Sequence, residues 1–386
     1  MIDPNLKQWA TPKQQAFIDA VIETGSYRAA AKKLGIHHDR VRTSLNSLKA
    51  RVALQGYSPA HDMTKTVPDG FSVKGVSSLY DERGTLRAQW VKSRREDVVS
   101  EQVIRDFVAT LVEDARGLSP IIPRREVNYQ DLLAVYPMGD PHFGMYAWAE
   151  EAGEDFNLEI AEQDLCDAVD SLVASAPPAH TALIAELGDL FHTDTELNRT
   201  QHSGNSLDVD TRWAKVMQVG LRALIHCIKR CLEKHEIVIV RITKGNHDGH
   251  SSFALALALD AYFSNNPRVQ VDLSPAAHWY FQFGKVLIGI THGDTTKMQD
   301  LPGVMAADKA VEWGQTTHRY WYVGHVHHDQ VKEYPGVKCE SFRTLAARDA
   351  WHAGQGHRAG RDMRCIVHHV EHGEIARHRC DIGMLR

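Results

Sequence analysis

The sequence has few cysteines and no apolar run long enough to cross a membrane. Its six cysteines show no metal-type pairing, and a disulfide framework is not expected in a chain of 386 residues. We therefore expect reduced thiols and a cytoplasmic location. The first fifteen residues also lack the apolar core of a signal peptide. These absences exclude a disulfide scaffold and a membrane partner.

Histidine and the distribution of charge stand out instead. The chain holds 23 histidines. Residues 1–125 carry 20 Lys/Arg against 14 Asp/Glu, whereas the remaining residues carry 24 against 35. We call the basic residues 1–125 the front end and the acidic, histidine-rich remainder the body. This charge distribution predicts that the front end binds polyanions and that the body binds cations.

The front end is expected to form three short helices. Thr11, with proline next and glutamine three residues later, forms a capping box that predicts the start of the first helix. Gly25 and Gly35 mark the ends of the first two helices. The third helix carries one apolar stripe at spacings of four, three and four, formed by Val41, Leu45, Leu48 and Val52.

A small-residue helix, a glycine turn and a basic helix resemble a helix-turn-helix of the winged-helix type. Residues 26–51 contain seven Lys/Arg and one acid, Asp39. This charge favours DNA binding, although three-helix units of this kind also serve as protein-interaction modules. The residues expected on or beside the open face of the third helix are His38, Arg40, Arg42, Thr43, Asn46 and Lys49.

The composition predicts three regions along the chain. A helix-turn-helix domain covers residues 1–55, a β-hairpin and helical linker region covers 56–125, and an α/β body covers 126–386. The predicted hairpin at 76–91 is either the wing of the first domain or a separate β unit. A closing hairpin is expected at 364–380, with histidines that fit no ligand spacing and are taken as surface residues.

Five apolar stretches in the body each end in side chains that can bind a metal. Open α/β sheets place their sites at such strand ends. The stretches are LLAVYPMGDPHFG with Asp140 and His142, ALIAELGDLFH with Asp189 and His192, IVIVRITKGNHDG with Asn246, His247 and Asp248, VLIGITHGD with His292, and YWYVGHVHHD with His325 and His327. Five such ends in succession predict a metal site.

This series resembles the calcineurin-like metallophosphoesterase superfamily over roughly residues 132–327. The resemblance implies an α/β fold in which a sandwich of two mixed β-sheets is flanked by helices and holds two metal ions at the strand ends. It assigns Asp140, His142 and His327 to the first metal. It assigns Asn246, His292 and His325 to the second, with Asp189 bridging both.

The residue types also suit two metals on chemical grounds. Two nearby dications need a shared anion to offset their repulsion, and a carboxylate supplies two oxygens. Several histidine ligands favour manganese, iron or zinc over magnesium, which prefers oxygen. We therefore expect two divalent ions, with manganese as the first choice.

Three further residues are expected to act on the substrate. In the superfamily, the histidine at the His247 position contacts the scissile phosphate and can protonate the leaving oxygen. Asp248 either orients the His247 ring or is a solvated loop acid. The segment GDLFH resembles the double-strand-break-repair nuclease branch, where the histidine at the His192 position helps to place the nucleic-acid backbone; His192 could also simply close its loop.

The sequence therefore predicts a metal-dependent phosphodiesterase, a DNA nuclease that acts by a two-metal mechanism with His247 assisting. In protein phosphatases of the superfamily, the sequence from the bridging aspartate onward is typically Asp-x-x-Asp-Arg-Gly, and the arginine that binds a phosphomonoester is missing here. The alternative is a phosphatase or nucleotide phosphodiesterase of small molecules, with the front end as an interaction module. DNA is the expected partner, and the sequence leaves a homo-oligomer open.

Overall fold

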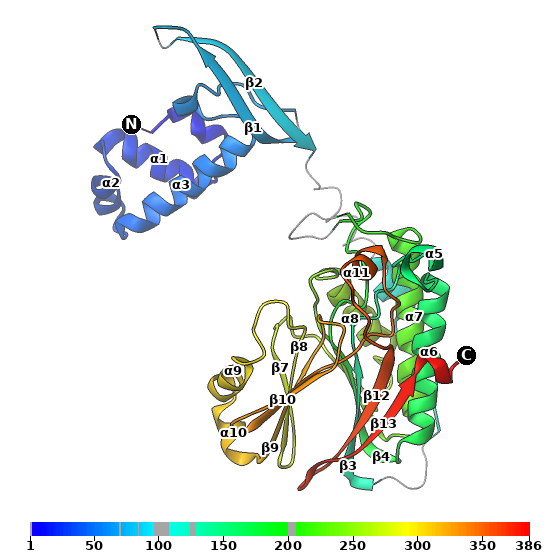
Figure 1. The fold of residues 1–386 in the computed structure, drawn as a ribbon. Helices are drawn as coiled ribbons and strands as arrows, with labels where there is room; N and C mark the ends of the chain where they lie inside the picture. Colours follow the sequence, from blue (N-terminus) through cyan, green and yellow to red (C-terminus); the bar gives the residue numbers. More distant parts are fainter. Residues whose placement is uncertain (1, 69–70, 84, 96–107, 124–128, 200–205) are drawn as a thin grey trace. The chain divides into compact units, whose positions relative to one another are not determined.

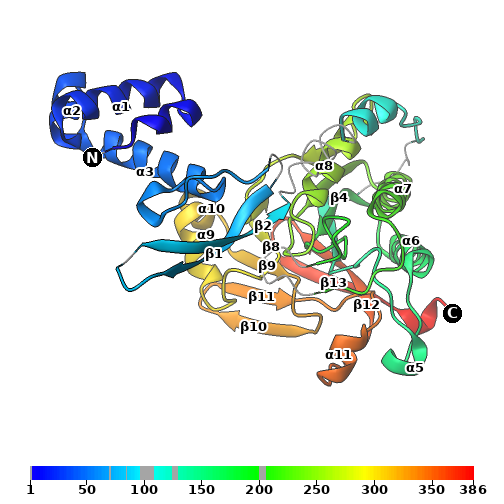
Figure 2. The same ribbon diagram turned by 90° about the horizontal axis from the view of Figure 1, so that it is seen from above.

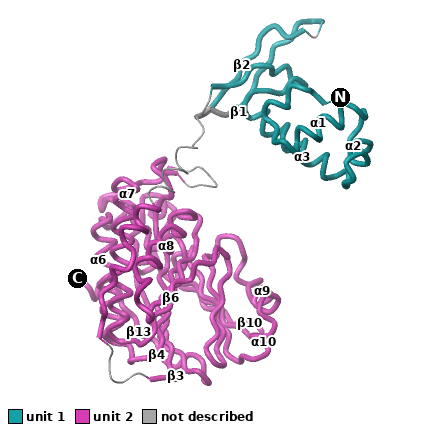
Figure 3. Tube along the Cα trace, turned by 180° about the vertical axis from the view of Figure 1, so that it is seen from behind, with its two compact units in different colours: residues 1–105 teal, residues 106–386 magenta. Residues whose placement is uncertain are grey.

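The chain folds as two compact units, residues 1–105 and 106–386 (Figure 3). The computed structural model describes all residues except 1, 69–70, 84, 96–107, 124–128 and 200–205. This division differs from the three regions expected, because the hairpin belongs to the first unit and the segment before residue 124 belongs to the second. That segment is held by backbone hydrogen bonds from Gly117 to Ala261 and from Ser119 to Tyr262.

The first unit contains three helices where the sequence places them. They are α1 (Pro12–Thr24), α2 (Tyr27–Leu34) and α3 (His38–Leu54), with short 3₁₀ turns at Pro4–Trp9 and Pro59–His61. The Thr11 capping box is present, and Gly25 and Gly35 end α1 and α2 in the left-handed conformation. The predicted stripe of α3 is buried in a core shared with Phe17 and Ile18.

The predicted hairpin forms in the same unit. Strands β1 (Phe71–Tyr80) and β2 (Leu86–Arg95) pair antiparallel and form a two-stranded sheet of their own. Helix α3 contacts β1. The hairpin is therefore an extension of the three-helix unit, and its large apolar side chains Leu79 and Trp90 are exposed.

The second unit is built on two mixed sheets (Figure 1). The six-stranded sheet has the order β13-β12-β3-β4-β5-β6, and its strands β3 to β6 run parallel. The five-stranded sheet has the order β10-β11-β9-β8-β7, with β8, β9 and β11 parallel. The strands are β3 (Tyr129–Met138), β4 (Ala179–Glu186), β5 (Ile237–Ile242), β6 (Val269–Asp272), β7 (Trp279–Phe283), β8 (Val286–Thr291), β9 (His318–Val323), β10 (Gln330–Tyr334), β11 (Val337–Ser341), β12 (Asp362–His369) and β13 (Gly373–Asp381).

The two sheets face each other across a shared apolar core, which confirms the predicted sandwich. Leu133 of β3 and Leu183 of β4 pack in one cluster with Ile288 of β8 and Tyr322 of β9. Alternate residues of each strand point into this layer, as the two-residue repeat of a strand requires. All five ligand-bearing stretches are strands of these two sheets.

Helices flank the sandwich on both sides (Figure 1). Helices α6 and α7 cover the six-stranded sheet, and α9 packs on Trp321 of the five-stranded sheet. None of the described helices is both long enough and apolar enough to cross a bilayer. The helices are α5 (Ala149–Ala152), α6 (Leu158–Ser175), α7 (Trp213–Leu232), α8 (Ser251–Tyr262), α9 (Leu301–Asp308), α10 (Ala310–Gln315) and α11 (Ala350–Gly354), followed by a 3₁₀ turn at Ile382–Met384.

One histidine of the closing hairpin is not on the surface. His368 of β12 is fully buried, and its Nε2 atom lies 2.7 Å from the hydroxyl of Tyr322 in the opposite sheet. Neighbouring residues of a strand face opposite sides, so the pair His368–His369 must place one ring inward. The expectation that all histidines of this hairpin are surface residues is therefore wrong for His368.

The buried His368 is expected to make folding sensitive to acid. Burial lowers the pKa of His368 to about 3. Below the unfolded value of about 6.5, the unfolded chain binds a proton there that the folded chain does not, so stability falls by about 1.4 kcal/mol per pH unit. Urea unfolding at pH 7.5 and pH 5.0 should show that His368→Gln, which keeps an acceptor for Tyr322, loses about 2 kcal/mol less than the wild type over this range. The same pH dependence in both proteins would contradict this role.

Candidate metal centre

The ends of five strands bring the predicted metal ligands together. Strands β3, β4 and β5 deliver residues from one sheet, and β8 and β9 deliver residues from the other. Two groups form in which the ligand atoms all lie within 4.8 Å of one another. The first is Asp140, His142 and His327, and the second is Asp189, His292 and His325.

Five of these ligands have an unusual backbone conformation. The φ angles are 47° at Asp140, 48° at His142, 56° at Asp189, 69° at His325 and 54° at His327. Residues with a side chain rarely adopt this left-handed region, and each costs on the order of 1–3 kcal/mol. Strain at five neighbouring positions persists only where the surrounding structure imposes it, so these strand ends are shaped for a site.

In the first group, two imidazoles and a carboxylate point toward one position. The Nε2 atoms of His142 and His327 lie 3.1 Å apart, and His327 Nε2 lies 3.5 Å from Asp140 Oδ1. The backbone N–H of His325 donates to both Asp140 oxygens at 2.9 Å, which fixes the carboxylate. Two neutral imidazole nitrogens and an anionic oxygen form a ligand set that suits Mn²⁺, Fe²⁺ or Zn²⁺.

The second group is arranged around His292. Its Nδ1–H donates to the Leu187 carbonyl at 2.9 Å, which leaves the lone pair on Nε2. That Nε2 atom lies 3.2 Å from Asp189 Oδ2 and 3.0 Å from the side-chain oxygen of Asn246. These three atoms are all acceptors, and a cation between them would bind to each. The predicted ligand Asn246 therefore belongs to this group.

Two glycines allow these side chains to approach. A Cβ atom on Gly245 would lie 1.9 Å from Asp189 Oδ1, and one on Gly188 would lie 2.5 Å from His292 Nδ1. Gly188 also has a φ of 100°, which a residue with a side chain rarely adopts. The Gly-Asp and Gly-Asn sequences are therefore required by close packing at the centre.

The charged groups of the centre shift each other's pKa values. Burial raises the pKa of Asp189, but His292 outweighs it and lowers that pKa to about 2. Burial lowers the pKa of His292, but Asp189 and Asp140 outweigh it and raise that pKa to about 10. Burial, together with the imidazoles of His327 and His247, holds the pKa of His142 well below its usual range. A divalent cation in the second group would replace the proton on His292. A cation in the first group would find His142 already neutral, as a ligand must be.

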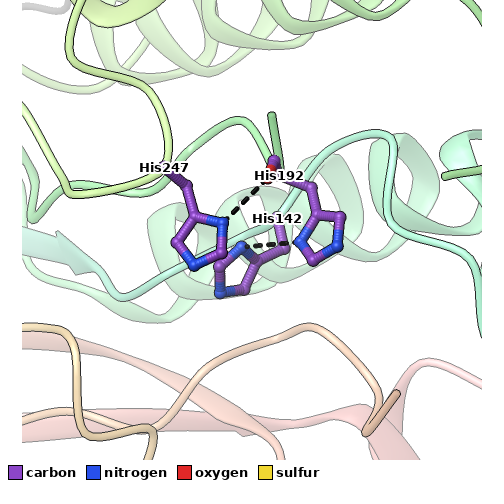
Figure 4. A group of neighbouring side chains, drawn as sticks. All are labelled: His142, His192 and His247. Atoms are coloured by element: carbon purple, nitrogen blue, oxygen red, sulfur yellow. Dashed lines mark hydrogen bonds between the residues drawn. The ribbon is translucent and has the colours of Figure 1, made fainter. Parts of the chain in front are cut away.

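The rings of His192 and His247 converge on that of His142, a member of the first group (Figure 4). His247 donates from Nδ1 to the His192 carbonyl at 2.9 Å, and its backbone N–H donates to Asp189 Oδ1 at 2.8 Å. The His192 ring stacks on the His247 ring at 5.4 Å, and its Nδ1 lies 3.4 Å from His142 Nδ1. The Nε2 atom of His192 is buried and has no hydrogen-bond partner among the described residues. Both predicted histidines therefore lie at the centre.

Asp248 has a different position from the one expected. It is fully buried, and its carboxylate accepts the backbone N–H groups of Gly245 at 2.9 Å and Phe191 at 3.2 Å. Both alternatives expected for Asp248 are wrong, because the His192 carbonyl orients the His247 ring and the Asp248 carboxylate is buried instead of solvated. Burial and the nearby Asp189 raise the pKa of Asp248 to about 8. Asp248 instead holds together the loops that carry Asn246 and His192.

The centre opens into a cavity of about 780 Å³. Its lining includes Asp189, His192, Asn246 and His247, together with α11 residues that the sequence analysis missed. Among these, His352 Nδ1 lies 2.7 Å from Asp349 Oδ1, and the His352 ring stacks on His327. The spacing of Asp349 and His352 is a helix-cap pattern and gave no sign of the site, because only the fold brings α11 to β9.

No family model matches the sequence, and no curated protein matches it. Among solved structures, a conserved uncharacterized protein from Streptococcus pneumoniae TIGR4, described as a predicted phosphoesterase, is 9% identical, with 66% of this chain and 99% of that chain covered and a TM-score of 0.27. Vps29 with Zn²⁺ from Entamoeba histolytica is 11% identical, with 64% and 99% covered and a TM-score of 0.26. A structure of PhoD is 10% identical, with 67% and 71% covered and a TM-score of 0.29. These identities and TM-scores are too low to support an argument about chemistry. The chemistry of the centre is therefore argued from its own side chains alone.

Proposed function

We propose that the second unit is a metal-dependent phosphoesterase, and that its substrate is the phosphodiester backbone of DNA. The observation that carries the proposal is the pair of ligand groups, both of which contribute residues to the lining of one cavity. Asp140, His142 and His327 would hold one divalent ion, and Asn246, His292 and His325 would hold the other. Asp189 would contribute to both. Imidazole nitrogens outnumber carboxylates in both groups, which favours manganese, iron or zinc over magnesium, and manganese is the ion that we propose first.

Bound divalent ions would supply positive charge for the phosphate and lower the pKa of a bound water. His247 is placed to handle a proton. Because its Nδ1–H is held by the His192 carbonyl, its Nε2 atom is left for the substrate. His247 lines the cavity and is half-buried, so a proton on Nε2 can be given to the leaving oxygen.

The proposal of a diester rests on His192. If His142 binds a metal through Nε2, its Nδ1–H donates to His192 Nδ1, and the proton of His192 is then on Nε2. That buried N–H lacks a partner among the described residues, and a substrate oxygen would satisfy it. A diester carries a second ester group that this N–H could hold in place, whereas a monoester does not. We therefore propose a diester as the substrate.

Hydrolysis of defined substrates tests this proposal. A labelled DNA duplex, a labelled single strand, bis(4-nitrophenyl) phosphate and 4-nitrophenyl phosphate are compared in the presence of Mn²⁺. We expect the DNA substrates and the small diester to be cleaved faster than the monoester. Rapid cleavage of the monoester alone would make the chain a phosphatase of small molecules and contradict the nuclease proposal.

We propose that the first unit binds DNA through α3. Its predicted contact residues Arg40, Thr43, Asn46 and Lys49 are exposed, whereas His38 is half-buried and Arg42 forms an ion pair with Asp39 at 3.0 Å. The apolar stripe of the helix is turned into the core, so the polar face is available. This helix therefore offers positive charge to phosphates.

Removing two of these charges should weaken DNA binding in a salt-dependent way. In Arg40→Gln/Lys49→Gln, we expect the slope of log affinity against log salt to decrease by about 2, since each phosphate contact contributes about 0.9. Fluorescence anisotropy over a range of salt concentrations measures this slope. The matched control is Lys13→Gln/Lys65→Gln, which removes two exposed charges outside α3. An equal change in the control would mean that α3 has no special role.

A further inference from the structure

Helix α11 places an exposed tryptophan beside the metal centre. Trp351 is 62% exposed and lines the same cavity as Asp189 and His247. Tryptophan is large and is usually mostly buried in soluble proteins. An indole that remains open to solvent beside a site is typical of a surface that receives a flat, apolar ligand.

Trp351 is connected to a metal ligand through one other ring. The ring of His327 stacks on His352 with 5.0 Å between centroids, and His352 meets Trp351 edge-on at 4.9 Å. Asp349 caps α11 by accepting the backbone N–H of His352, and its carboxylate also lies 2.7 Å from the His352 ring. Trp351 therefore sits on a fixed support, and one ring, that of His352, separates it from the metal ligand His327.

A second cavity adjoins the metal-centre cavity at α11. Its volume is about 380 Å³, and it shares His352 and His357 with the metal-centre cavity. Arg348 lines it, and within the described part of the chain this guanidinium donates to the His357 carbonyl but forms no ion pair. Helix α5 packs beside α11 (Figure 2). A nucleic-acid strand that runs past Trp351 would therefore place its next phosphate near the positively charged Arg348.

We propose that Trp351 stacks on an unpaired nucleobase next to the scissile phosphodiester, so that the enzyme selects single-stranded or frayed ends of nucleic acid. This inference rests on the proposed phosphodiesterase function. A paired base inside a duplex is covered on both faces by its neighbours, whereas an unpaired base offers a free face to the indole. Stacking of a base on an aromatic side chain changes binding by about 5-fold to 150-fold when the side chain is replaced by alanine.

Steady-state kinetics with Mn²⁺ test the inference on three substrates. These are a short oligothymidylate, an abasic strand of the same length, and methyl 4-nitrophenyl phosphate. For the wild type, we expect KM to be at least about fivefold lower for oligothymidylate than for the abasic strand. Trp351→Ala should raise KM for oligothymidylate to the abasic value with little change in kcat. Trp351→Phe should recover part of the difference.

A matched variant serves as the control, and three results would contradict the inference. Trp148 is 55% exposed and precedes the neighbouring helix α5, but it is not among the described residues that line the cavity. Trp148→Ala should therefore leave both KM values unchanged. Equal KM values for the two strands in the wild type, or an equal rise on both strands in Trp351→Ala, would overturn base stacking while the diesterase remains. A wild type that hydrolyses none of the three substrates would overturn the proposed function and the stacking inference together.

Discussion

Asp189→Asn is expected to lower the rate of phosphodiester hydrolysis by on the order of 10³-fold or more. Asp189 is the residue proposed to touch both metals, and its two oxygens are already fixed by His292 and the His247 backbone. An amide presents one oxygen and no charge, so one ion loses a ligand and the mutual repulsion of the two ions is no longer offset. Metal ions contribute several kcal/mol to such reactions, and each 1.36 kcal/mol corresponds to tenfold in rate. The measurement is kcat/KM for bis(4-nitrophenyl) phosphate at saturating Mn²⁺.

Asp164→Asn is the matched control. Asp164 of α6 is also a buried carboxylate, but it pairs with Arg361 at 2.7 Å outside the two ligand groups. Its variant should have a lower melting temperature and near wild-type turnover, because it breaks a buried ion pair without touching the centre. Wild-type turnover in Asp189→Asn would contradict the two-metal assignment.

His247→Leu and His192→Ser are expected to separate two roles. His247→Leu should reduce kcat/KM on diester and monoester alike by roughly 10²-fold to 10⁴-fold, because a proton donor at the leaving oxygen serves every substrate. His192→Ser should retain both metals and lose mainly diester hydrolysis, because it removes the buried N–H proposed to guide the second ester group. Both activities and the metal content are measured in each variant.

His192→Ser also removes the acceptor for His142 Nδ1, and His192→Asn controls for this loss. The asparagine side chain keeps an acceptor for His142 Nδ1 but lacks the Nε2 donor, so it should resemble His192→Ser in diester hydrolysis. If either variant loses a metal, His192 is a ligand, as its closeness to His142 and His247 would allow. Equal losses on monoester and diester would remove the reason for preferring a nuclease.

Much of the metal centre could be predicted from the sequence because it depends on strand ends. The apolar stretches before Asp140, Asp189 and His292 fix where strands stop, and parallel strands bring their carboxyl ends to one edge. The assignment of the seven ligands to two metals came from the resemblance to the metallophosphoesterase superfamily, without knowledge of side-chain directions. The structure adds what the pattern does not contain, namely the left-handed turns that aim those side chains inward.

The residues that were misjudged or missed depend on long-range packing. Asp248 lies next to His247 in sequence, but the turn directs its carboxylate to backbone N–H groups and away from the His247 ring. His368 is buried because its strand β12 pairs with β3 in the middle of the sheet. Trp351 comes to the cavity on a five-residue helix whose position no local periodicity encodes.

The most direct test is to locate metal in the protein by anomalous diffraction from crystals grown with Mn²⁺. The account predicts two anomalous peaks in one cavity. One lies between Asp140, His142 and His327, and the other lies between Asn246, His292 and His325, with Asp189 touching both. A chain without bound metal, or a single ion held by His142, His192 and His247, would contradict it.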